Sequence, residues 1–133
     1  MLNRLFTPKA DIKDGMTQAQ REAIVDLLHY CMFADNLITI SENQFIAAKV
    51  QSFSWDPKIS FEYYQGKSIG AARAALGDPK VKERFFESAK QRLATPALRK
   101  QALELCQKLF LADGNKAQGE FASEKEVRSG LGL

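Results

Sequence analysis

A segment of this chain recurs 78 residues later, and acidic residues recur with it. Residues 21–42 and residues 99–120 each begin with arginine, continue through an apolar run to an Ala-Asp pair, and reach a glutamate seven residues after that aspartate. The matched pairs are Arg21 and Arg99, Asp26 and Glu104, Leu27 and Leu105, Ala34 and Ala112, Asp35 and Asp113, and Glu42 and Glu120. Two packed copies of one helical unit require matched apolar positions, whereas packing does not require matched acids. The pattern predicts an internal two-fold pseudo-repeat, and the acids are the first place to look for function.

The chain has 133 residues, a length that suits one domain with a single core. Residues 1–16 show little hydrophobic periodicity, so we expect an N-terminal arm followed by one helical domain over residues 17–133. Cys31 and Cys106 fall on apolar faces of expected helices, which indicates two buried thiols in a reducing compartment rather than a disulfide framework. The opening residues lack the apolar stretch of a signal peptide, and no run approaches the roughly 18 apolar residues of a membrane span. We therefore expect a cytoplasmic protein without a membrane span.

Apolar residues recur at helical spacing along the domain, and no segment alternates as a strand does. We expect an all-α fold of about six or seven helices. The expected helices cover residues 17–34, 41–53, 60–76, 79–93, 96–111 and 119–129. The third of these ranges is expected to divide into a short helix and a longer one, with Gly66 and Gly70 as the possible breaks.

Several helix starts carry capping signals. Thr17 and Ser41 each precede a glutamine by three residues, which is the spacing of a capping box. Asp78 and Thr95 each precede a proline, which is favoured at the first helical position. In the first helix the apolar residues Ile24, Leu27, Leu28 and Cys31 define one face, which leaves Glu22, Asp26 and His29 on the opposite side.

Asp35 and Glu42 flank one loop between expected helices, and Asp113 and Glu120 flank the matching loop. Each aspartate follows a helix end and each glutamate lies in the first turn of the next helix, so the paired carboxylates can approach one point. Calcium and magnesium prefer carboxylate and backbone oxygens, so they are the expected ions, although neither loop has the residue pattern of an EF-hand. The alternative is structural, because a first-turn acid stabilises a helix by roughly 0.3–1 kcal/mol and a turn aspartate commonly caps its own backbone.

Asp26 and Glu104, the matched acids inside the two helices, are second-tier candidate metal ligands. Asp26 and His29 have the carboxylate-x-x-His spacing of di-iron helical bundles, but such sites need that pair twice. His29 is the one histidine of the chain and Gln107 occupies the matching position, so we do not expect a di-iron centre. The alternative for both acids is a solvated helix face. No glycine-flanked nucleophile or phosphate-binding glycine loop accompanies the histidine, so we expect no enzymatic activity.

The net charge is +3, and the basic excess lies in residues 49–100, which hold eleven Lys and Arg against five Asp and Glu. These basic residues are scattered, without a basic run, zinc-ligand spacing or an aromatic-glycine signature, so nucleic acid is not an expected partner. The same segment holds the aromatic residues Trp55, Phe61, Tyr63 and Tyr64. An exposed cluster of this kind could dock a protein, whereas aromatic residues at this density usually complete a small core.

The acidic loops resemble those of the tellurite-resistance TerB-like family, and the similarity covers residues 17–133. The family pattern is Ala-Asp-Gly, one further residue, an apolar residue, a glutamate seven residues after the aspartate, and a final helix ending in Leu-Gly-Leu or Leu-Gly-aromatic. In this chain the pattern is Ala112-Asp113-Gly114 to Glu120 with Leu131-Gly132-Leu133, and Ala34-Asp35-Asn36 with Ile38 to Glu42. Asn36 departs from the usual glycine, and Lys116 departs from the usual apolar residue and can neutralise the acids beside it.

The resemblance implies a compact helical domain with internal pseudo-symmetry, an acidic site that binds divalent metal, and a link to tellurite or other chemical stress. It implies no enzymatic reaction and fixes no partner. Two functions stay open. The chain is either a metal-binding stress-response or signalling domain that uses Asp35, Glu42, Asp113 and Glu120, or a metal-free helical adaptor whose aromatic and basic middle binds an unknown protein partner.

Overall fold

The computed structural model describes residues 15–35, 40–111 and 122–133, and these residues form a compact all-helical fold without strands. The described helices are α2 (Gln18–Ala34), α3 (Ile40–Ser52), α4 (Phe61–Gly77), α5 (Pro79–Arg92), α6 (Pro96–Phe110) and α7 (Ala122–Gly130). The all-α prediction is confirmed, and the capped helices begin within a residue of their predicted starts. None of these helices is long and apolar enough to cross a membrane.

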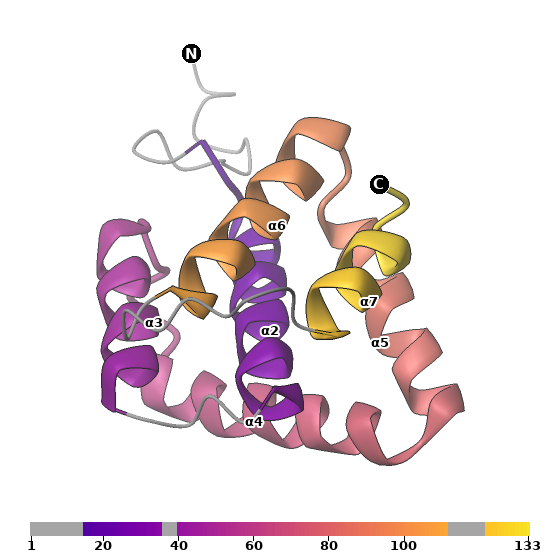
Figure 1. Ribbon diagram of the computed structural model, residues 1–133. Coiled ribbons are helices and arrows are strands. Elements are labelled where there is room, and N and C mark those ends of the chain that lie inside the picture. The colour runs from indigo at the N-terminus through magenta and orange to yellow at the C-terminus, as the bar shows by residue number, and fades with distance from the viewer. Residues whose placement is uncertain (1–14, 36–39, 112–121) are drawn as a thin grey trace.

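Helix α2 stands at the centre of the fold and contacts each of the other described helices. Helices α3 and α5 flank it, α6 and α7 lie on one face, and α4 crosses its C-terminal half (Figure 1). Every residue from Ala23 to Met32 is buried. The alternative that places Asp26 on a solvated helix face is therefore wrong, and His29 beside it is buried as well. A helix covered on all sides has no solvated face, and α4 and α5 enclose the side that carries the polar residues.

The first turns of α2 and α6 are built alike. Thr17 and Thr95, which are 78 residues apart, are the N-caps of the two helices, and Thr17 forms the predicted capping box with Gln20. The matched arginines then fold back onto the chain that precedes each helix. Arg21 donates to the Met16 carbonyl at 2.7 Å, and Arg99 donates to the Leu93 carbonyl at 2.7 Å.

The apolar pair of the two segments is buried as well. Leu27 is 0% exposed and Leu105 is 8% exposed, and α6 packs directly on α2. The two segments that match in sequence therefore both contribute to the core, as their shared apolar positions predict.

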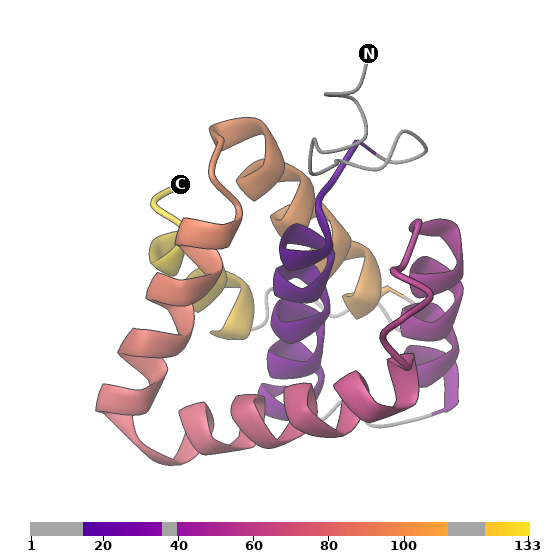
Figure 2. The same cartoon turned by 180° about the vertical axis from the view of Figure 1, so that it is seen from behind.

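Helix α4 is one continuous helix, so the predicted breaks at Gly66 and Gly70 are wrong. Ser68, Ala72 and Ala75 are the buried residues of this helix, which packs against α2 where the two helices cross (Figure 2). Tertiary packing overrides the weak helix propensity of the two glycines, which lie on the exposed side.

Two other local features concern helix ends. Helix α3 begins at Ile40, so Ser41 lies inside it and is not the N-cap that its capping-box spacing predicts. Helix α7 ends in a Schellman motif, in which the Leu133 N–H bonds the Arg128 carbonyl and the Gly132 N–H bonds the Ser129 carbonyl. Gly132 adopts a φ of 75°, a left-handed conformation that glycine accommodates without strain.

Candidate functional site

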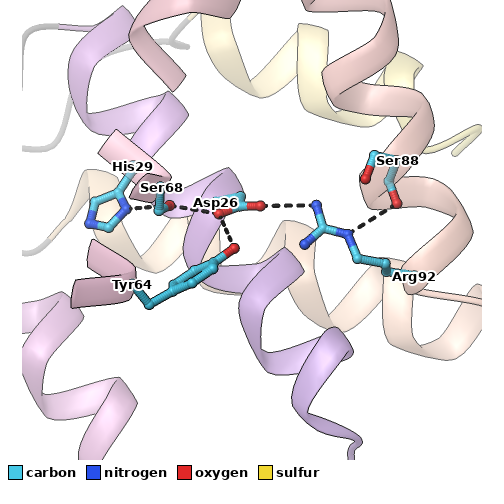
Figure 3. A network of polar contacts seen from close by, with 6 residues as sticks. All are labelled: Asp26, His29, Tyr64, Ser68, Ser88 and Arg92. Atoms are coloured by element: carbon cyan, nitrogen blue, oxygen red, sulfur yellow. Dashed lines mark hydrogen bonds and ion pairs between the residues drawn. The ribbon is translucent and has the colours of Figure 1, made fainter. Parts of the chain in front are cut away.

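The most elaborate polar site in the described part of the chain surrounds the carboxylate of Asp26 on α2. Tyr64 and Ser68 of α4 donate their hydroxyls to its Oδ1 at 2.7 and 2.6 Å, and Arg92 of α5 donates Nη2 to its Oδ2 at 2.9 Å (Figure 3). Asp26 is 6% exposed. Three donors and one positive charge therefore compensate a carboxylate that the fold removes from water.

Helical spacing explains why these partners converge. Tyr64 and Ser68 are four residues apart, so they share one face of α4, and that face packs against α2. Arg92 lies in the last turn of α5, where the helix dipole favours a cation. None of the three is among the metal ligands expected from the sequence, although Tyr64 belongs to the aromatic group that could form a docking surface. The signal that could have identified the site is the run from Ala23 to Met32, in which Asp26 and His29 interrupt a helix that is otherwise apolar on every side.

His29 extends the network by one residue. Ser68 gives its single hydroxyl hydrogen to Asp26, so the 2.8 Å contact between His29 Nδ1 and Ser68 Oγ assigns the imidazole proton to Nδ1. Nε2 is then an unprotonated acceptor that is buried and has no hydrogen-bond partner among the residues that the structure describes. Burial lowers the pKa of His29 to about 4, although the nearby charge of Asp26 acts to raise it. The imidazole is therefore neutral at pH 7.

The order of these groups determines what they can do chemically. Asp26 contacts Ser68 and Ser68 contacts His29, whereas a hydrolytic triad needs the histidine between the serine and the acid. Ser68 is 2% exposed and His29 is 0% exposed. The arrangement can hold a charge and a fixed tautomer, but the serine hydroxyl faces a carboxylate and not an accessible substrate. Of the residues in this network, Asp26 and Arg92 also line a surface cavity with a volume of about 280 Å³.

The two second-tier metal candidates lie in different environments. Asp26 already has Arg92 as its cation, whereas Glu104 is exposed on α6. The matched positions in the two helices therefore do not form a common acidic site with shared partners.

Asp35, a principal candidate ligand, is the C-cap of α2 and contacts the first turn of α7. Both the hydroxyl and the backbone N–H of Ser123 donate to its carboxylate, and Ser123 is fully buried. Burial raises the pKa of Asp35, while these two hydrogen bonds act in the opposite direction. An acid near a helix N-terminus is stabilising, so Asp35 acts as a cap for a helix distant in sequence. Its partner Ser123 had no distinguishing signal in the sequence.

Glu42, the second candidate ligand of the first loop, lies in the first turn of α3 and is 0% exposed. Asp113 and Glu120, the candidates of the second loop, lie outside the described residues. Within residues 15–35, 40–111 and 122–133, no group of three or more His, Cys, Asp or Glu side chains is arranged to hold a metal ion. The described residues thus include two of the four predicted loop ligands.

The aromatic residues near the start of α4 divide into a packed group and one exposed ring. Trp55 lies edge-on to Phe61 with ring centroids 5.2 Å apart, and it donates its indole N–H to the Ile59 carbonyl. The Tyr64 ring lies 5.7 Å from Trp55, while its hydroxyl binds Asp26. Tyr63, by contrast, is 69% exposed.

Both cysteines are free and buried, as the sequence predicts. Cys31 of α2 and Cys106 of α6 are close neighbours. Hydrogen bonding to Cys31, together with burial, raises the pKa of Cys106 well above its usual value, so this thiol is protonated at neutral pH.

Comparison with known proteins gives no relative from which a function can be transferred. No family model matches the chain, and no curated protein and no solved structure matches it. The functional argument therefore depends on the chemistry of the residues described above.

Proposed function

We propose that this chain is a non-enzymatic TerB-like helical domain that binds a divalent cation, calcium or magnesium, through Asp35, Glu42, Asp113 and Glu120. The domain would act in the response to tellurite or other chemical stress, a role that rests on the resemblance of its two acidic loops. The pseudo-repeat that pairs these loops is part of the proposal, and it is supported by the matched caps and arginines at the starts of α2 and α6.

The recurrence of the Ala-Asp pair and its glutamate at two loops 78 residues apart is the observation that carries the proposal. A divalent cation held by these acids would explain why they recur at matched positions, which helix packing does not require. Glu42 is also 0% exposed, and such burial is unusual for a glutamate on the surface of a helix. Asp35 supports the same conclusion, because its raised pKa means that the fold disfavours its charged form, which a bound cation would restore.

The proposed absence of enzymatic activity is supported by the one histidine of the chain. His29 is fully buried, its Nδ1 contacts Ser68, and Ser68 itself is only 2% exposed. A general base must reach the proton that it removes, and His29 has no access to a bound substrate.

A metal titration of the melting temperature tests the proposal. The protein is stripped with chelator and titrated separately with calcium, magnesium, manganese and zinc, because a ligand that binds only the folded state raises stability by mass action. We expect calcium or magnesium to raise the melting temperature and Glu42→Gln to abolish most of that increase. Glu120→Gln should remove less of it, because Lys116 supplies a competing positive charge in the second loop.

Glu62→Gln is the matched control for the metal titration. Glu62 is also a first-turn glutamate, at the start of α4, but it is exposed. Its substitution should leave the response to metal unchanged. A melting temperature that ignores all four ions would exclude the cation-binding function.

The second candidate function, a metal-free adaptor, is favoured by one observation. Tyr63 is 69% exposed, and Lys67 lies with its Nζ 6.0 Å from the ring centroid. Aromatic residues dominate interface hot spots, so an unburied tyrosine beside a lysine is a suitable partner contact. An adaptor would show no response to metal, and Tyr63→Ala would weaken partner binding while leaving the melting temperature unchanged.

A further inference from the structure

A second binding site is suggested by the cavity of about 280 Å³ that lies beside the Asp26 network. Its lining includes Asp26 of α2, Ala74 of α4, and Arg84, Phe85, Ser88 and Arg92 of α5. The charged members therefore come from two helices, and Arg84, Ser88 and Arg92 follow one another at four-residue intervals along one side of α5. The cavity shares no lining residue with the acidic loops.

The charges around the cavity favour an anion. Two arginines face one aspartate, which leaves one positive charge in excess. A larger cavity of about 750 Å³ lies between α5 and α7, but it is lined by Lys82, Lys90 and Lys125 against Glu83, Glu87 and Glu126, so its charges cancel. Glu126 there is already paired with Lys82 at 2.8 Å. The smaller cavity is therefore the one with a charge preference.

The hydrogen-bond donors in the small cavity are partly free. Arg92 uses Nη2 on Asp26 and Nε on the Ser88 carbonyl, while its Nη1 bonds no other described residue (Figure 3). The side chain of Arg84 makes no ion pair or hydrogen bond with any residue that the structure describes. Because a guanidinium can give two parallel N–H bonds to a carboxylate, these groups form a receptor for a planar oxyanion.

The remaining lining limits the size and charge of the ligand. Phe85, Val81, Ala71 and Ala74 provide apolar walls, and the volume falls below the usual range of cavities that hold drug-sized ligands, about 300–1,000 Å³. A dianion would bring a second negative charge toward Asp26, which repels it. A single carboxylate on a small apolar body fits both conditions.

We propose that the cavity between α4 and α5 binds a small monocarboxylate, whose carboxylate contacts Arg84 and Arg92 and whose apolar body packs against Phe85 and Ala74. Arg92 would then contact the ligand and Asp26 together. Ligand binding would tighten the packing of α5 against α2 and α4, so a bound monocarboxylate stabilises the fold.

Sodium benzoate is a suitable probe, and benzyl alcohol is its neutral counterpart of similar shape. Binding is measured by calorimetry and by the shift in melting temperature at constant ionic strength, with inorganic phosphate as a third titrant. We expect benzoate to bind and raise the melting temperature, while benzyl alcohol and phosphate do not. Arg84→Gln should weaken benzoate binding by about tenfold or more, the loss associated with a charge-assisted hydrogen bond.

Two further variants separate the cavity from general charge attraction. Lys80→Gln removes the same charge from an exposed residue near the start of α5 that does not line the cavity, and it should leave benzoate binding unchanged. Ala74→Leu keeps both arginines but fills part of the cavity, and it should abolish binding. Arg84 and Ala74 are both exposed, so neither change removes a core contact. Equal binding of benzoate and benzyl alcohol, preferential binding of phosphate, unchanged affinity in Arg84→Gln, or no binding of benzoate would each overturn the proposal.

Discussion

Ser123, in the first turn of α7, donates both its hydroxyl and its backbone N–H to Asp35, the residue that ends α2. The two residues are 88 positions apart in the sequence. This contact joins the end of the central helix to the start of the last described one. It also supplies hydrogen-bond donors to the Asp35 carboxylate, which is partly buried.

Ser123→Ala should destabilise the protein by about 1–3 kcal/mol, because it removes a hydroxyl donor from a partly buried carboxylate. The loss should be smaller in saturating calcium or magnesium if a cation binds Asp35. Urea unfolding with and without the ion measures both effects. Ser129→Ala changes an exposed serine of the same helix, and its free energy of unfolding should stay within about 0.5 kcal/mol of the value for the unchanged protein. Equal effects of the two substitutions would contradict the capping role of Asp35.

His29 predicts a loss of stability in acid. Its pKa is about 4 in the folded protein and 6.5 when unperturbed, so the unfolded chain binds the proton more readily. His29 does not change the free energy of unfolding above pH 6.5. As the pH falls from 6.5 to 4, protonation of His29 in the unfolded chain lowers the free energy of unfolding by about 3 kcal/mol in all. The slope of unfolding free energy against pH should be smaller in His29→Gln, which cannot titrate. Parallel slopes in the two proteins would show that His29 is not the responsible group.

Breaking the Asp26–Arg92 pair should cost about 2–3 kcal/mol, between the values of exposed and fully buried pairs. The side chains of this pair are 8% and 24% exposed. Asp26→Asn tests the value by urea unfolding. Arg128→Gln is the control, because it breaks the surface pair with Glu124 and should cost no more than about 0.5 kcal/mol. A cost for Asp26→Asn as small as that of the control would mean that the network contributes little to stability.

Leu105→Ala should cost about 2–5 kcal/mol, the usual range for a buried leucine. The measurement is again urea unfolding, and Leu111→Ala, a change at a leucine that is 53% exposed, is the control. A loss below about 1 kcal/mol would be incompatible with the burial of Leu105 on the side of α6 that faces the core.

Glycine substitutions should have opposite effects in different helices. A methyl group added at Gly66 or Gly70 would meet nothing within 4 Å, so alanine at either position should stabilise the protein by about 0.5–1 kcal/mol. Gly130→Ala should destabilise it, because the added Cβ would lie 2.7 Å from the Phe86 ring. Thermal melting of the three variants gives the comparison. An increase in melting temperature for Gly130→Ala would mean that Phe86 can move aside.

The sequence predicts those parts of the fold that depend on local chemistry. Thr17, Asp78 and Thr95 act as N-caps, as predicted. Capping needs only a side-chain oxygen within three residues of a backbone N–H in the first helical turn, so it does not depend on the rest of the fold. The prediction failed at Ser41, where helix α3 already begins at Ile40. It also failed at Gly66 and Gly70, where contacts with α2 hold the helix continuous.

The site was less predictable because its partners come from separate helices. Asp26 could be singled out, but the sequence suggested either a metal ligand or a solvated side chain, since periodicity alone cannot show that α4 and α5 cover that side of α2. Tyr64, Ser68 and Arg92 lie 38 to 66 residues from it, and no local pattern connects them. The pairing of Asp35 with Ser123 could not be predicted for the same reason, because the two residues lie 88 positions apart on separate helices.

The central position of α2 has a consequence for the order in which the protein is made. Translation produces α2 before each helix that covers it, and the Tyr30–Glu126 and Asp35–Ser123 bonds join residues 96 and 88 positions apart. A nascent chain that ends after α6 therefore leaves the side of α2 that faces α7 exposed to other proteins in the cell. Stable folding must wait until residues 122–130 have left the ribosome, and during that interval the chain is open to chaperones and to aggregation.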